Sequence, residues 1–137
     1  MKKIIFVCTG NTCRSPMAEG IFNKIAKENQ LDIFAESAGL FANEGESVTQ
    51  NAVLACKEKG IDISGHKSRQ LTEQLSKTAD FIVPMTQNHR EICIKLFKET
   101  SVLPALDIPD PYGGDLDVYR LCRDKITEMC EKIADCN

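Results

Sequence analysis

The stretch from Cys8 to Pro16 constrains the chain more than any other part of the sequence. It reads CTGNTCRSP, follows an apolar run from Ile4 to Val7, and leads into a segment whose apolar residues recur with helical spacing. This order indicates a buried strand, a tight loop and the start of a helix. Because the first backbone N–H groups of a helix have no partners within it, such a loop favours the binding of an anion.

The residue types in this loop suit that role. Ser15 is a favoured N-cap, and Pro16 fits the first helical position, where its missing N–H costs nothing. Gly10 and Asn11 tolerate the left-handed backbone angles that a tight cradle requires. We therefore expect a helix that begins at Ser15 and a loop that turns sharply just before it.

A thiol and a guanidinium, Cys8 and Arg14, stand near the two ends of the loop. A sulfur that faces a helix N-terminus and an arginine should have a depressed pKa, which favours the nucleophilic thiolate. The planar fork of Arg14 matches two oxygens of a phosphate. We predict a tetrahedral oxyanion with its central atom in line with the sulfur. The simpler alternative, a buried cysteine that ends a strand, leaves Arg14 unexplained, and a Walker A loop is excluded because no Gly-Lys-Ser/Thr follows.

Length and composition favour one globular domain over residues 1–137. The chain is 42% hydrophobic and 27% charged, which is ordinary for such a domain. A net charge of −3 argues against a general nucleic-acid-binding protein. We find no apolar stretch long enough to span a bilayer or to act as a signal peptide, so we expect no membrane partner and a cytoplasmic location.

The seven cysteines do not form a recognisable pattern of structural disulfides or metal ligands. Their number is odd and their spacing irregular, so structural disulfides are not expected. There is no Cys-x-x-Cys, and His66 and His89 lie far along the chain from Cys8 and Cys13, so no metal site is expected either. The remaining cysteines are predicted at ordinary helix positions: Cys56, Cys93, Cys122, Cys130 and Cys136.

Strand and helix patterns alternate along the chain. Strands are predicted at 3–8, 32–37, 80–85 and 101–106. Helices are predicted at 15–29, 47–59, 72–77, 86–98 and 115–134, with Ser47 and Thr72 as caps and Gly60 as a stop. Such alternation favours an α/β fold of three layers, a parallel sheet with helices on both faces, whose ligand-binding loops follow the strand ends.

The loop also resembles that of a known family. Cys8 to Ser15 reads Cys-x5-Arg-Ser, and with the Pro-Met-Ala-Glu that follows it resembles the low-molecular-weight protein tyrosine phosphatases. The resemblance is strongest to their bacterial protein-arginine phosphatase branch, and it runs from Lys3 to about Ile133. It implies a four-stranded parallel sheet in the order 2-1-3-4.

In this family an Asp-Pro loop carries the general acid, which the resemblance assigns to Asp110. An acid is needed because the leaving group must be protonated as its bond to phosphorus breaks. From the residues alone, the segment around it is also a turn-rich connector, and Asp107, Asp115 and Asp117 are rival acids. The last two would also suit the start of the final helix, where acids complement the helix dipole.

The resemblance further implies which residues bind the phosphate, line the mouth of the pocket and hold the loop in its conformation. The phosphate-binding positions are Thr9, Gly10, Asn11, Thr12, Cys13, Arg14 and Ser15. Tyr112 matches an aromatic residue at the mouth of the pocket, whereas Gly113 departs from a second aromatic common in the tyrosine phosphatases. The positions that hydrogen-bond one another and hold the strained loop are Asn11, Ser15, Ser37 and His66. The Ser15 hydroxyl can also donate to the Cys8 thiolate.

These matches predict a phosphatase that works through a cysteinyl-phosphate intermediate and needs no metal or organic cofactor. Cys8 attacks phosphorus, Arg14 and the loop amides stabilise the equatorial charge, and Asp110 protonates the leaving group and then activates water. The expected partners are phosphorylated proteins, and the product is inorganic phosphate.

Thr12 distinguishes two substrates. The matching position is usually a branched aliphatic residue in tyrosine phosphatases of the family and threonine in its arginine phosphatases, so phosphoarginine is the first hypothesis and phosphotyrosine the second.

Thioredoxin-linked arsenate reductases share the loop but use two further cysteines on a mobile segment, and only Cys93 lies between residues 65 and 104. A phosphate sensor without activity is disfavoured by the intact nucleophile and acid.

Cys13 predicts a redox response, since it shares the loop with Cys8. A low-pKa, exposed thiolate is the form that peroxide oxidises. We expect a reversible Cys8–Cys13 disulfide that turns activity off. A disulfide demands a specific geometry, and if the two cysteines do not meet it, Cys13 has a purely structural role.

Overall fold

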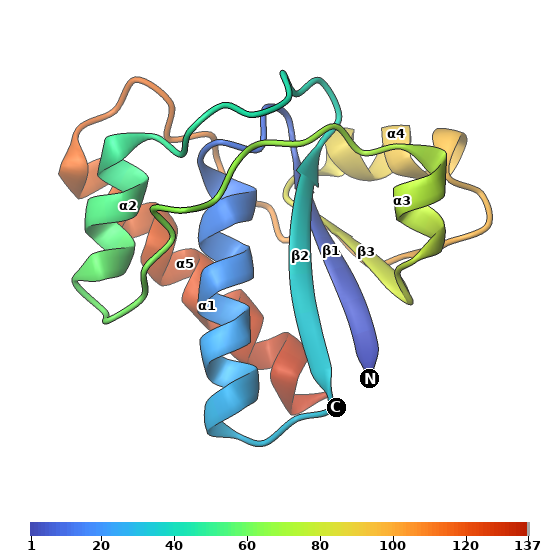
Figure 1. Ribbon diagram of the computed structural model, residues 1–137, viewed down its shortest axis with the longest axis horizontal. Coiled ribbons are helices and arrows are strands. Elements are labelled where there is room, and N and C mark those ends of the chain that lie inside the picture. Colours follow the sequence, from blue (N-terminus) through green and yellow to red (C-terminus); the bar gives the residue numbers. More distant parts are fainter. Residues whose placement is uncertain (137) are drawn as a thin grey trace.

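A computed structural model describes residues 1–136 and shows one parallel sheet between two groups of helices (Figure 1). The strands are β1 (Lys2–Cys8), β2 (Ile33–Gly39), β3 (Phe81–Pro84) and β4 (Ser101–Val102). They are parallel and lie in the order β2-β1-β3-β4. The predicted α/β class and strand order are therefore confirmed.

The helices divide between the two faces of the sheet. Helices α1 (Arg14–Glu28), α2 (Gln50–Lys57) and α5 (Leu116–Asp135) lie on one side, and α3 (Glu73–Lys77) and α4 (Gln87–Leu96) lie on the other (Figure 1). No helix within residues 1–136 is both long and apolar enough to cross a membrane.

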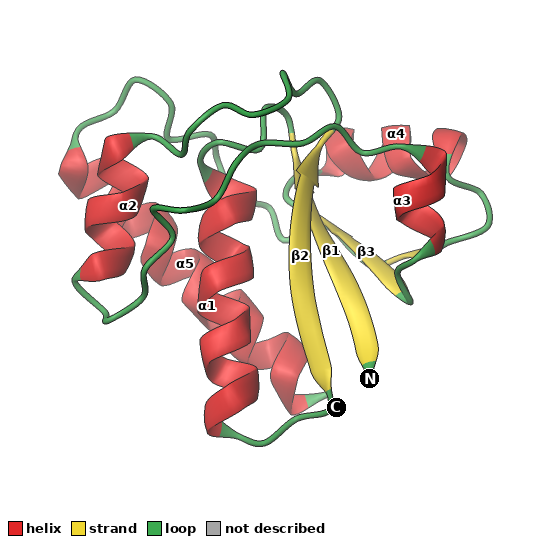
Figure 2. Ribbon diagram, viewed as in Figure 1, coloured by secondary structure: helices red, strands yellow, loops and turns green. Residues whose placement is uncertain are grey.

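The central strand β1 is buried on both faces. Ile4 and Phe6 join the larger apolar core, to which α1 and α5 contribute, while Ile5 and Val7 join the smaller core beside α4. Side chains alternate along a strand, so a continuous apolar run is needed where both faces are covered. The carboxyl ends of the strands meet at one edge, where long loops gather (Figure 2). The loop that follows β1 therefore begins between the ends of β2 and β3.

Strand β4 is shorter than predicted. It comprises only Ser101–Val102 instead of residues 101–106. Pro104 has no N–H to donate, and this interrupts regular pairing with β3. The Leu106 amide still donates to the Pro84 carbonyl at 3.0 Å, so the connector continues along β3 toward the edge that holds the loops.

Two predicted helix caps are wrong. Ser15 is the second residue of α1, whose N-cap is Cys13 and has no side-chain cap bond. Ser47 lies before α2, whose N-cap is Thr49. The amide of Thr49 donates to the carbonyl of Thr12 at 3.0 Å, so the chain before α2 packs against the β1–α1 loop instead of extending the helix.

The other predicted boundaries lie within two residues of those in the structure. Thr72 caps α3 by accepting from the Leu75 amide, and Asp115 caps α5 by accepting from the Val118 amide. Gly60, three residues beyond α2, has a φ of 73°. That left-handed conformation favours glycine and ends the helical segment.

The cysteines outside the loop lie on helices or at a helix end. Four are buried, and Cys136 is exposed at the end of α5; the buried ones are Cys56, Cys93, Cys122 and Cys130. Burial raises the pKa of Cys56 and of Cys122 to about 12 and that of Cys93 to about 11. These buried thiols are therefore protonated, unreactive side chains at neutral pH.

Candidate active site

Cys8 ends β1 with its sulfur turned into the β1–α1 loop. It is 3% exposed, its Sγ lies 2.8 Å from Ser15 Oγ, and the Asn11 amide donates to it at 3.3 Å. The side chain of Asn11 also donates to Ser15 Oγ at 2.8 Å, which occupies a lone pair of that hydroxyl. The Ser15 hydrogen is then free to be donated to the sulfur. The loop thus directs two donors at one sulfur.

The expected depression of the Cys8 pKa is not found. Burial raises the pKa of this thiol, while the hydrogen bonds from Ser15 and Asn11 and the charge of Arg14 lower it. Desolvation opposes the charged form of any group, and here it is the largest influence. The donors that favour the thiolate are in place, but they offset the cost of burial only in part.

Arg14 joins the loop to the connector that precedes α5. It is 5% exposed, its Nη1 donates to the Ile108 carbonyl at 3.0 Å, and its Nη2 lies 3.8 Å from Asp110 Oδ2. The side chain of Asp110 is 56% exposed, and its Oδ1 accepts from the Tyr112 amide at 3.0 Å. One guanidinium therefore holds together the cysteine loop and the segment that carries the predicted acid.

The rival acids are arranged differently. Asp115 caps α5, and Asp117 pairs with Arg120 at 2.7 Å, so each has another role at the helix start. Asp107 is exposed on a left-handed backbone with φ of 61°. Of the four aspartates considered, the structure brings Asp110 to the guanidinium. Tyr112 follows it with 76% of its surface exposed, beside the site and not packed into it.

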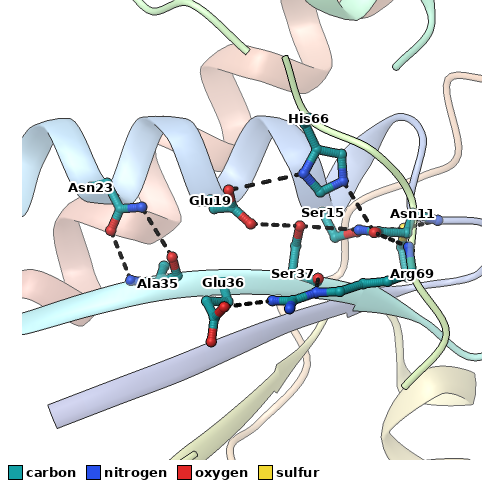
Figure 3. A network of polar contacts seen from close by, with 10 residues as sticks. Asn11, Ser15, Glu19, Asn23, Ala35, Glu36, Ser37, His66 and Arg69 are labelled. Atoms are coloured by element: carbon teal, nitrogen blue, oxygen red, sulfur yellow. Dashed lines mark hydrogen bonds and ion pairs between the residues drawn. The ribbon is translucent and has the colours of Figure 1, made fainter. Parts of the chain in front are cut away.

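Asn11 is the centre of a buried polar network (Figure 3). Its φ is 58°, a strained conformation for a residue other than glycine. Its side chain donates to Ser15 Oγ and, at 3.0 Å, to Ser37 Oγ. Its Oδ1 accepts from His66 Nε2 at 3.1 Å and from the Arg69 amide at 3.0 Å. The four predicted supports are thus brought together, and Arg69 joins them.

Glu19 extends this network and is not among the residues that the sequence predicted for it. The Ser37 hydroxyl donates to Glu19 Oε1 at 2.9 Å, and His66 Nδ1 lies 3.9 Å from Glu19 Oε2 (Figure 3). Burial raises the pKa of Glu19 and lowers the pKa of His66. Glu19 lies four residues after Ser15, one helical turn along, and that spacing was the available signal.

Gly39 was also missed as a requirement of the site. A Cβ at this position would lie 2.5 Å from the Thr9 carbonyl oxygen and 3.1 Å from the Asn11 amide nitrogen. Both atoms are backbone, so a side chain cannot be accommodated without moving the loop. Gly10, by contrast, lies outside the positive-φ region, so only Asn11 of the predicted pair adopts the left-handed conformation.

Thr12 and Cys13 complete the loop. The Thr12 hydroxyl lies 3.7 Å from the point that a Cβ on Gly10 would occupy and 3.9 Å from Cys13 Sγ, so it lies against neighbouring residues of the loop. Cys13 is 6% exposed, and its Sγ lies 3.5 Å from both Tyr119 Oη and Thr49 Oγ1. Within residues 1–136, no cluster of three histidine, cysteine or acidic side chains is placed to hold a metal.

A parallel α/β sheet with a cysteine at the end of its central strand and a buried arginine at the end of the loop that follows is the arrangement of a class of cysteine-dependent phosphatases. The chain belongs to the low molecular weight phosphotyrosine protein phosphatase family, whose profile matches residues 3–136. Among its relatives is a protein-arginine-phosphatase of Bacillus subtilis, 41% identical over 96% of this chain and 93% of the relative.

Solved structures agree with this assignment. One is a cysteine-to-serine mutant of the arginine phosphatase YwlE with a phosphorylated active-site serine, with TM-score 0.92, 40% identity and coverage of 97% of this chain and 93% of the other. Another is a low molecular weight protein tyrosine phosphatase from T. tengcongensis, with TM-score 0.95, 36% identity and full coverage of both chains.

Proposed function

We propose that this protein hydrolyses phosphoarginine on proteins through a cysteinyl-phosphate intermediate. The observation that carries the choice of substrate is Thr12, which places a hydroxyl in the loop at the position where a branched aliphatic residue would favour an aromatic substrate. The likeness to relatives named as arginine phosphatases supports it. Phosphotyrosine is the second candidate, favoured by relatives of comparable similarity named as tyrosine phosphatases.

In the first step Cys8 attacks phosphorus in line with the leaving group. The Ser15 hydroxyl and the Asn11 amide, which already face the sulfur, stabilise its thiolate. Arg14 and the loop amides bind the equatorial oxygens, whose charge is held throughout the transfer. Asp110 donates a proton to the departing nitrogen or oxygen as its bond to phosphorus breaks.

In the second step the same groups act in reverse. Asp110, now ionised, removes a proton from a water that attacks the cysteinyl phosphate, and Cys8 leaves as thiolate. Its exposed side chain, close to Arg14 and beside solvent, suits both proton transfers. The products are inorganic phosphate and the unmodified protein side chain.

Turnover of matched peptides tests the proposal. Two peptides of one sequence, with phosphoarginine or phosphotyrosine at the same position, are compared by kcat/KM, with Cys8→Ser as the control for contaminating phosphatases. We expect the phosphoarginine peptide to be the better substrate by about tenfold or more, which is about 1.4 kcal/mol in transition-state binding. A preference for phosphotyrosine would overturn the substrate assignment and leave the phosphatase chemistry intact.

A generic aryl phosphate separates the remaining alternatives. Hydrolysis without added thiol or metal would exclude a non-catalytic sensor and disfavour an arsenate reductase. The structure adds a reason against the reductase, since Cys93 is fully buried in α4 within the apolar core and is not available for thiol exchange.

A further inference from the structure

His89 makes a contact with the phosphate loop that the proposed mechanism does not use. It lies in the first turn of α4 and is 7% exposed. Its Nε2 lies 2.9 Å from Thr9 Oγ1, and its Nδ1 lies 2.9 Å from Thr86 Oγ1. Thr86 is the N-cap of α4, and its hydroxyl accepts from the His89 amide at 3.3 Å. A continuous polar chain therefore runs from the cap of α4 to the residue after Cys8.

The imidazole of His89 is neutral near neutral pH. Burial and the charge of Arg14 lower the pKa of His89 to about 4, with Asp110 acting in the opposite direction. A neutral ring has one N–H and one lone pair, so it joins one hydroxyl as donor and the other as acceptor. The influence of Arg14 and Asp110 also places the ring within the electrostatic field of the site.

The backbone of Thr9 is already held from the other side. Its carbonyl accepts from the Phe41 amide at 3.0 Å, and it lies against Gly39, where a Cβ would approach it to 2.5 Å. The side chain, in contrast, stands in an exposed position of the loop. Its hydroxyl would rotate freely without a partner, and His89 is the partner that orients it.

We propose that His89 is a positioning residue of the phosphatase reaction and acts through the hydroxyl of Thr9, the loop residue that directly follows the nucleophile, whose direction it fixes. The inference rests on the proposed function. One bond to His89 leaves this hydroxyl with further hydrogen-bonding capacity, which is presented to the substrate in a fixed direction. A group oriented before the reaction requires no reorganisation during it.

A double-mutant cycle tests this role. His89→Phe keeps a ring but removes both hydrogen bonds, Thr9→Val removes the hydroxyl at similar volume, and both are combined. His89→Gln is the conservative variant, because its amide retains a donor and an acceptor. Cys93→Ala is the matched control, a buried residue one turn further along α4 that packs in the apolar core and not on the loop. For each variant kcat, KM, inhibition by inorganic phosphate and Tm are measured.

We expect His89→Phe and Thr9→Val each to lower kcat about tenfold on phosphoarginine and aryl phosphate, on the scale of one hydrogen bond, with phosphate inhibition little changed. The double variant should be no worse than either single one, and His89→Gln should recover most of the loss. Losses that multiply in the double variant would overturn the proposal. The proposal would also be overturned if Cys93→Ala and His89→Phe lowered Tm equally and lowered kcat equally, because the loss of kcat would then follow from the loss of stability alone.

The two proposals fail differently in this experiment. A wild-type protein that turns over neither substrate would overturn the phosphatase function itself. An active wild type with independent losses at His89 and Thr9 would overturn only the positioning role.

Discussion

The hydroxyl of Ser15 lies 2.8 Å from the sulfur of Cys8, so this residue contacts the proposed nucleophile, as the family resemblance implies, and does not cap helix α1. Asn11 donates to the same hydroxyl and directs its hydrogen toward the sulfur. The hydrogen bond from this oriented donor lowers the pKa of Cys8 more than the charge of Arg14 does.

Ser15→Ala should impair turnover by the same factor at every pH below the pKa of Cys8. Burial raises that pKa, the hydrogen bond from Ser15 lowers it, and loss of the bond raises it further. We expect kcat/KM to fall about tenfold across neutral pH and the loss to shrink only at a pH above the pKa of Cys8. Ser37→Ala is the control, because Ser37 contacts Asn11 but not the sulfur. A loss that does not shrink at high pH would show that Ser15 acts only on the shape of the loop.

Cys8→Ser should abolish turnover and preserve phosphate binding. A neutral hydroxyl lacks the nucleophilicity of the thiolate, while Arg14 and the loop remain in place. Calorimetry with inorganic phosphate measures the binding, and Cys136→Ser, at an exposed position at the end of α5, should retain full activity. Turnover by the Cys8→Ser variant would rule out the covalent intermediate.

Asp110→Asn should slow poor leaving groups more than good ones. Without the acid, an alkyl phosphate must depart unprotonated, whereas a nitrophenolate leaves readily by itself. We expect losses that differ by about tenfold or more between the two ester classes. Asp107→Asn serves as the comparison, since that carboxylate lies nearby in the chain. If both esters suffered equally, Asp110 would have a structural role only.

Mild peroxide should inactivate the protein through a reversible Cys8–Cys13 disulfide, and the reaction should be slow because Cys8 is 3% exposed and burial raises its pKa, contrary to the exposed, low-pKa thiolate expected from the sequence. Each sulfur gives up one electron and one proton as peroxide is reduced to water. Cys13 lies under the loop against Tyr119 Oη at 3.5 Å, so pairing requires it to leave that contact. Mass spectrometry should detect the cross-link, and a dithiol should restore activity. The Cys13→Ser variant should instead lose its activity irreversibly. Formation of sulfinic acid without a disulfide in the wild-type protein would contradict the prediction.

Thr12→Ile should move the substrate preference and leave the chemistry intact. The change removes a hydroxyl and adds apolar bulk at the loop, while Cys8, Arg14 and Asp110 are untouched. Turnover of phosphoarginine should fall relative to aryl phosphate by about tenfold, which needs about 1.4 kcal/mol. Equal losses on both substrates would mean that Thr12 only shapes the loop.

Local sequence was sufficient for the framework of this protein. The apolar run before Cys8, the spacing of Cys8 and Arg14, and the alternation of strand and helix patterns predict a parallel sheet with an anion-binding loop at its edge. These signals are short-range, since strand burial, helical periodicity and loop chemistry each depend on residues close in the chain. The order of the strands came from the family resemblance, and the structure confirms it.

Tertiary structure decided how individual side chains are used. Ser15 and Ser47 would cap helices by local preference, worth about 1 kcal/mol, but contacts made by the loop determine where α1 and α2 begin. The pairing of His89 with Thr9 spans 80 positions, and no periodicity reports it. The pKa of Cys8 likewise depends on burial by the whole fold, because desolvation is set by what surrounds a group and not by its neighbours in the chain.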